Sequence, residues 1–64
     1  MIKPYVLYRA SQSLEMARKE FDSFVAAHSW YTQKTKQAQQ QHIYWEAILF
    51  DDKGEGFSMS FIRN

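Results

Sequence analysis

The sequence of 64 residues predicts a small α+β domain, in which one main amphipathic helix packs on an antiparallel sheet in the order β-α-β-β. Three observations predict this class. Apolar residues recur at helical spacing after two serines, residues 42–50 alternate as a strand, and residues 57–62 alternate again after a glycine-containing turn. The length, near the lower limit for a self-sufficient core, predicts that residues 1–64 form a single domain.

The first strand is predicted at Lys3–Arg9, a segment rich in aromatic and β-branched residues. Pro4 has no backbone N–H, so it fits only at the start of this strand or on a sheet edge. Val6 and Tyr8 share one face of the strand, because successive side chains point to opposite faces.

The helix is predicted from Gln12 to about His28. Ser11 or Ser13 is a suitable N-cap, since either hydroxyl can accept a hydrogen bond from a free N–H. The apolar stripe that predicts the helix recurs at spacings of three and four. Its members are Leu14, Ala17, Phe21, Phe24 and His28.

The structure of residues 30–40 is left open between three alternatives: a continuation of the helix, a second short helix, or an additional strand. A single helix over Gln12–Gln40 would be about 44 Å long, which suits an oligomer better than a compact monomer. A break near His28 followed by a second short helix is the next alternative. The third is a strand through Trp30–Thr32.

The central strand is predicted at His42–Phe50, and both of its faces are largely apolar. Asp51–Gly56 supplies turn residues, so residues 57–62 return as the second strand of a hairpin with their serines outward. We assign one face of this hairpin to the core against the helix, although the two faces can be exchanged without violating the pattern. The core residues on this assignment are Trp45, Leu49, Phe57, Met59 and Phe61.

Composition and motifs favour no catalytic, metal or cofactor chemistry. The chain has no cysteine, and His28 and His42 do not have the spacing of a metal site. Asp51, Asp52 and Glu55 lack the pattern of a calcium loop and fit a charged turn. We therefore expect no enzyme, cofactor, metal or small-molecule substrate. No apolar run is long enough to cross a membrane, and a cytoplasmic location is expected.

The function predicted first is protein binding, because one helix cannot cover both apolar faces of the central strand. The uncovered face is expected to bind a second copy in a homodimer, or another protein. An adaptor, an inhibitor or a small regulator fits this prediction. The expected interface residues are Tyr8, Tyr44, Ile48 and Phe50.

The alternative is a nucleic-acid-binding module, in which the sheet aromatics stack on bases and nearby cations hold phosphates. A net charge of +1 argues against strong phosphate binding. A minimal enzyme is the third and least favoured hypothesis, since so small a domain rarely encloses a cleft. The candidate phosphate contacts are Lys3, Arg9, Lys34, Lys36 and Arg63.

Overall fold

The computed structural model describes residues 2–63 and contains one helix and one four-stranded antiparallel sheet. The elements follow in the order β1 (Tyr5–Arg9), β2 (Ala17–Glu20), α1 (Phe24–Gln41), β3 (Trp45–Phe50) and β4 (Gly56–Ile62). In space the strand order is β2-β1-β3-β4, so β2 and β4 form the two edges.

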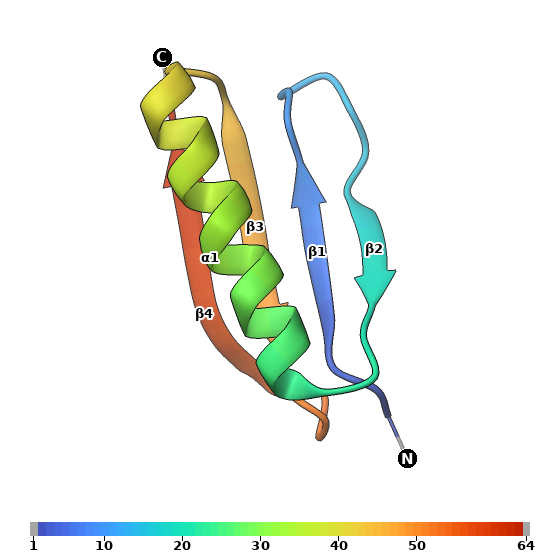
Figure 1. Cartoon of the computed structure of the whole chain (residues 1–64). Helices are drawn as coiled ribbons and strands as arrows, with labels where there is room; N and C mark the ends of the chain where they lie inside the picture. Colours follow the sequence, from blue (N-terminus) through green and yellow to red (C-terminus); the bar gives the residue numbers. More distant parts are fainter. Residues whose placement is uncertain (1, 64) are drawn as a thin grey trace.

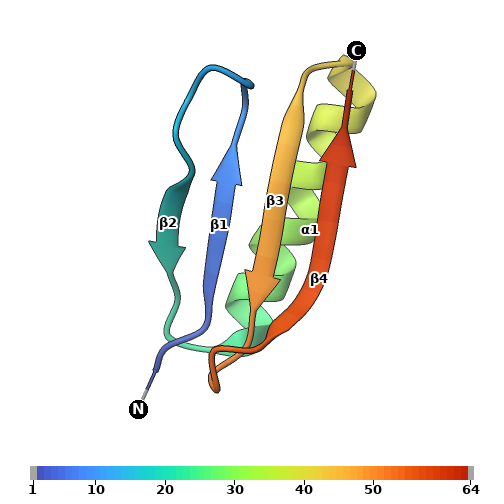
Figure 2. The ribbon, with the colours of Figure 1, turned by 180° about the vertical axis from the view of Figure 1, so that it is seen from behind.

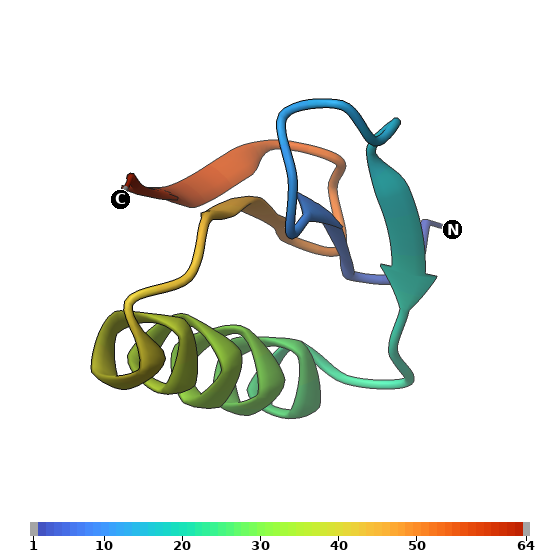
Figure 3. The ribbon, with the colours of Figure 1, turned by 90° about the horizontal axis from the view of Figure 1, so that it is seen from above.

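The molecule has two layers, and the helix lies on one face of the sheet only (Figure 1). Viewed from above, α1 forms one layer and the four strands form the other (Figure 3). Viewed from behind, the strands lie in front of the helix and no other element crosses them (Figure 2). The predicted α+β class is therefore confirmed, with one sheet face covered and the other open.

The predicted start of the helix is wrong, because residues 17–20 form strand β2 beside β1. Tyr5 lies opposite Glu20, and Tyr8 lies opposite Ala17. The hydroxyls of Ser11 and Ser13 lie 3.0 Å apart in the connecting loop and cap no helix. The three-four spacing that predicted a helix here is overridden by long-range strand pairing, which local periodicity cannot reveal.

The helix is displaced toward the C-terminus and occupies the whole segment that the sequence left open. Ser23 is the N-cap, since its hydroxyl accepts the N–H of Ala26 at 3.2 Å. The helix ends at His42, whose φ of 55° is left-handed and whose N–H bonds the carbonyl of Ala38. Its 18 residues give a length of about 27 Å.

The core lies between α1 and the two central strands. Val6 and Leu49 are the largest completely buried side chains. Buried polar groups are hydrogen-bonded: Trp45 Nε1 donates to Thr35 Oγ1 at 2.9 Å, as burial of an indole N–H requires. The seven buried residues of the hydrophobic core are Val6, Ala27, Tyr31, Ala38, Trp45, Ala47 and Leu49.

The hairpin of β3 and β4 forms as predicted, with Asp51 organising its turn. The Asp51 carboxylate accepts the N–H groups of Glu55 and Lys53, and Gly54 takes a φ of 79°. Since both bonds favour the charged carboxylate, first that from Glu55 and then that from Lys53, they lower the pKa of Asp51.

The face assigned to β4 is wrong, however. Its serines point toward the helix, because Ser58 lies opposite buried Leu49 and Ser60 lies opposite buried Ala47. The hydroxyl of Tyr31 on α1 lies within hydrogen-bonding distance of both serine hydroxyls, which makes a polar pair acceptable there. Three residues predicted in the core are instead exposed. These are Phe57 at 59%, Met59 at 70% and Phe61 at 56%.

Candidate protein-binding surface

The face of the sheet that the helix leaves uncovered is built from three cross-strand rows. Residues directly opposite each other on neighbouring strands share a face, so the register defines these rows. We call their eight side chains on β1, β3 and β4 the open face; the rows continue onto β2 with Glu20, opposite Tyr5, and Arg18, opposite Leu7. The rows are Tyr5–Phe50, Leu7–Ile48–Met59 and Arg9–Glu46–Phe61.

The middle row is apolar across three strands. Leu7, Ile48 and Met59 lie side by side on β1, β3 and β4, and no other element covers them (Figure 2). Leu7 and Ile48 are half-buried by their neighbours, whereas Met59 is mostly exposed. An apolar strip of this kind in the centre of a face, with polar groups around it, has the anatomy of a protein interface.

Aromatic stacking borders the strip at one end. The rings of Tyr5 and Phe50 stack with centroids 4.5 Å apart and an interplanar angle of 11°. The guanidinium of Arg18, from edge strand β2, lies 3.9 Å from the centre of the Tyr5 ring. The strip therefore ends in a preassembled stack that needs little reordering to contact a partner.

A compact ion pair borders the strip at the other end. Arg9 Nε donates to Glu46 Oε1 at 2.6 Å, and the hydroxyl of Tyr44 donates to the same oxygen at 3.0 Å. The Tyr44 ring also packs edge-on against Phe61, with centroids 5.7 Å apart. These contacts hold three polar side chains in one arrangement beside the apolar strip.

The same contacts shift the pKa values of the two charged groups in opposite directions. The hydrogen bond from Arg9, followed by that from Tyr44, lowers the pKa of Glu46. The bond to Glu46 raises the pKa of Arg9. Both groups are therefore ionised at neutral pH and cancel each other's charge on the open face.

A hollow of about 340 Å³ lies at the β4 side of this surface. Its lining contains no titratable side chain, so its chemistry suits an inserted apolar group rather than catalysis. The lining residues are Ile48, Gly56, Phe57, Ser58 and Met59.

The structure brings three of the four expected interface residues together. Ile48 and Phe50 belong to the open face, and Tyr44 adjoins it through Glu46 and Phe61. Tyr8 does not belong with them, because it lies on the covered side of β1. Its ring packs 5.1 Å from Trp30 and 5.7 Å from Trp45 and forms part of the interior.

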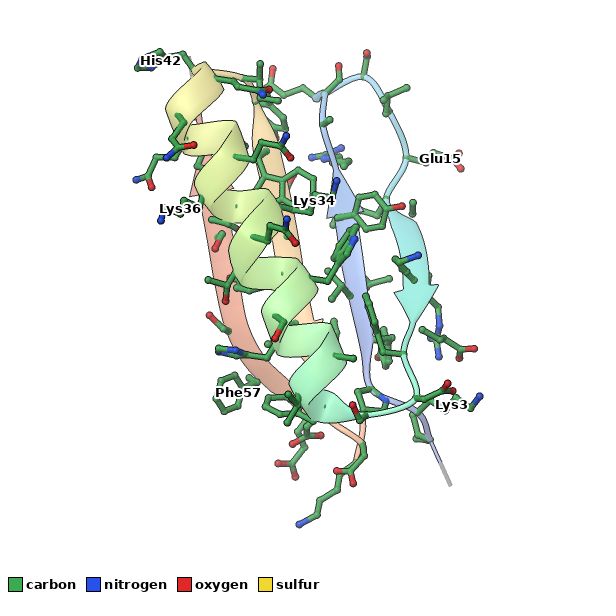
Figure 4. The ribbon with its side chains drawn as sticks, viewed as in Figure 1. Lys3, Glu15, Lys34, Lys36, His42 and Phe57 are labelled. Atoms are coloured by element: carbon green, nitrogen blue, oxygen red, sulfur yellow. The ribbon has the colours of Figure 1, made fainter. Side chains whose placement is uncertain are left out.

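The five expected phosphate contacts are not gathered on one face. Lys34 and Lys36 project from the helix, and Lys3 lies at the opposite end of the molecule near Asp22 (Figure 4). Arg9 is held by Glu46, and the Arg63 guanidinium lies 5.9 Å from the Phe61 ring centre. No shared groove for a phosphate backbone follows from this distribution.

Sequence reasoning missed Leu7, Met59 and Phe61 as members of the open face. The signal that finds them is the hairpin register, since Met59 lies opposite Ile48 and Phe61 lies opposite Glu46. Alternation within residues 57–62 shows only that these side chains share a face. It does not show which face the helix covers.

Comparison of the chain with protein-family models, with curated proteins and with solved structures gives no match. Within residues 2–63, α1 is too polar to be a membrane-spanning helix. Over the same residues, no three side chains of the metal-binding types are grouped around a common point.

Proposed function

We propose that this chain is a small protein-binding module that acts as a homodimer and contacts its partner through the open face. The observation that carries the proposal is the uncovered apolar strip of Leu7, Ile48 and Met59. Such a strip is costly to leave in water, and each Å² of apolar surface that a partner covers contributes about 25 cal/mol. A regulator, adaptor or inhibitor is the class of protein that this surface suits.

The dimensions of the molecule show that one broad side is large enough for a stable protein–protein interface. Its extents are 37 × 21 × 15 Å, so it is a flat plate with the open face on one broad side. A stable interface needs roughly 800 Å² from each partner. A broad side of this plate is of that order, whereas its narrow sides are smaller.

The composition of the open face also supports a protein partner rather than a nucleic acid. Tyr, Phe, Met and Arg, the residue types enriched in protein interfaces, make up most of it. Both arginines at this face are paired, Arg9 with Glu46 and Arg18, opposite Leu7 on β2, with Glu20. A polyanion therefore finds little free positive charge there. The absence of cysteine supports the cytoplasmic location expected for such a module.

The test is capture of partners from the native cell by the tagged chain and by two lysine variants. Ile48→Lys places a charge in the middle of the strip, and Val25→Lys is the matched control. Val25 is 74% exposed and lies on α1, away from the open face. We expect Ile48→Lys to lose the captured protein and Val25→Lys to retain it.

The site of contact is then mapped by backbone amide shifts on adding the captured protein. Shifts concentrated on β1, β3 and β4 support the proposal. Equal capture by both lysine variants, or shifts confined to α1, would contradict it. The nucleic-acid alternative predicts instead a mobility shift at low salt that added salt removes.

A further inference from the structure

We propose that the open face binds a second copy of this chain, so that two sheets pack face to face about a two-fold axis. The axis runs parallel to the strands and lies between β1 and β3. This inference rests on the proposed function, since it names the partner that covers the apolar strip and states which residues of the two copies meet.

The apolar rows of the open face are complementary to themselves. A two-fold axis parallel to the strands turns one sheet over onto the other and exchanges β1 with β3. Tyr5 of each copy then meets Phe50 of the other, because these residues lie opposite each other on β1 and β3. In the middle row, Leu7 meets Ile48 in the same way. Aromatic side chains therefore meet aromatic ones, and aliphatic side chains meet aliphatic ones.

The charged row determines where this axis lies. Arg9 Nε is 2.6 Å from Glu46 Oε1, so one copy presents a cation on β1 beside an anion on β3. With the axis between these strands, Arg9 of each copy faces Glu46 of the other, and the four charges alternate in sign. An axis on β1 would oppose two arginines, and an axis on β3 would oppose two glutamates. Like charges repel, so the position between the strands is favoured.

A two-fold axis perpendicular to the strands is disfavoured by the same row. Such an axis reverses the order of the rows, so the ring of Phe50 in one copy lies against the carboxylate of Glu46 in the other. Burying a carboxylate against an apolar ring carries a desolvation cost that no new cation offsets. The axis parallel to the strands avoids this cost, because each row meets its own kind.

The size and net charge of the surface also suit a second copy. Antiparallel sheets pack about 10 Å apart with their strands nearly aligned, which is the arrangement that the parallel axis produces. The contact uses a broad side of the 37 × 21 × 15 Å plate, the side facing the reader in Figure 2. That side is of the order of the roughly 800 Å² that a stable interface needs. Arg9 and Arg18 are balanced by Glu46 and Glu20, so the two faces do not repel.

The test is rescue in trans, because Leu7 of one copy is expected to face Ile48 of the other. Leu7→Asp and Ile48→Lys each place two charges against apolar side chains in their own homodimer. We expect each variant alone to raise the dimer dissociation constant about 100-fold in sedimentation velocity. An equimolar mixture pairs the introduced aspartate with the introduced lysine, and its dissociation constant is expected to return to within about 10-fold of the unmodified value. Val25→Lys, on α1, is the control and is expected to dimerise normally.

A spin label on β4 tests the direction of the axis while leaving Leu7 and Ile48 unaltered. The chain has no cysteine, so Met59→Cys gives a single attachment site at an exposed side chain. In a mixture with isotope-labelled chain that carries no spin label, only contacts between copies broaden the observed amide signals. The parallel axis places β4 of one copy over β2 of the other, so the strongest broadening is expected at Arg18. A perpendicular axis would broaden β4 instead.

Three results would overturn the inference. The first is an unmodified chain that stays monomeric at every concentration. The second is a mixture of folded Leu7→Asp and Ile48→Lys chains that dimerises no better than either chain alone. The third is broadening that is strongest on β4 or α1 rather than on β2. Circular dichroism establishes whether the two variants fold, and the spin-label result decides alone if either does not.

The capture experiment separates this inference from the proposed function. If the partner is a second copy, the protein captured from the native cell is the chain itself, which mass spectrometry identifies. A monomeric chain that captures a different protein, and loses it in Ile48→Lys, would refute the second copy and leave the proposed function standing. Equal capture by Ile48→Lys and Val25→Lys, without dimerisation of the chain, would refute both.

Discussion

The covered and open faces of the sheet come from alternate residues of the same strands, but they distribute polarity in opposite ways. On β4 the covered face carries Ser58 and Ser60, and the open face carries Met59 and Phe61. The covered serines are satisfied by Tyr31, whereas the open apolar side chains have no cover. Burial and hydropathy are therefore uncoupled over residues 58–61, whereas Ile62, opposite Trp45, packs against the core as an apolar residue should.

The largest difference between the two faces is expected from truncating one apolar residue on each. Leu49→Ala removes a completely buried side chain and is expected to cost about 2–5 kcal/mol of unfolding free energy. Met59→Ala, on the open face, is expected to change it by at most about 0.5 kcal/mol. Urea denaturation of both variants measures the two changes in unfolding free energy. Comparable losses at both sites would contradict the separation of the faces.

A smaller effect is expected from removing the Tyr31 hydroxyl, which is within hydrogen-bonding distance of the two serines on the covered face. Tyr31→Phe leaves two serine hydroxyls without their partner, which is expected to cost about 1–2 kcal/mol in thermal or urea unfolding. Tyr44→Phe is the matched control, because its hydroxyl bonds Glu46 at the half-exposed rim of the open face. If Tyr44→Phe is the more destabilising change, the polar contact under the helix matters less than we infer.

The smallest effect concerns pH and the ion pair on the open face. Hydrogen bonds from Arg9 and Tyr44 lower the pKa of Glu46, so its folded-state value lies below its unfolded value. Its stabilising contribution is therefore complete above the unfolded pKa, near pH 4, and is lost as pH falls through the folded pKa. Asp51, whose pKa is also lowered, acts in the same direction.

The measurement is the melting temperature as a function of pH for the unmodified chain and for Glu46→Gln. We expect the unmodified chain to lose stability on acidification below about pH 4. Glu46→Gln is expected to melt slightly lower at neutral pH and to show a shallower acid dependence, with Asp51 supplying the remainder. Identical curves for the two proteins would show that the pair contributes nothing measurable.

The hairpin of β3 and β4 and strand β1 were predictable, because turn residues and alternation are local signals. The helix was only partly predictable. Residues 17–20 have a helical spacing and become a strand only because β1 lies beside them. The helix itself buries little beyond Ala27, Tyr31 and Ala38, and its exposed side is rich in glutamine, so its apolar stripe is weak.

The candidate surface was predictable to the extent that it depends on β3. Alternation places Ile48 and Phe50 on the face opposite Leu49, and burial of Leu49 decides which face is open. The membership of Met59 could not be derived in the same way. It depends on the register between β3 and β4, which is shifted by a bulge. It also depends on the Tyr31 hydroxyl, which gives Ser58 a hydrogen-bond partner beneath the helix.

The guanidinium of Arg9 joins parts of the chain that are otherwise separate. It donates to Glu46, 37 positions away, and to the carbonyls of Gln12 and Leu14 in the loop before β2. One side chain thus makes the shape of a surface loop depend on the alignment of two interior strands. An insertion or deletion in this loop would disturb not only its own path but also the charge balance beside the apolar strip.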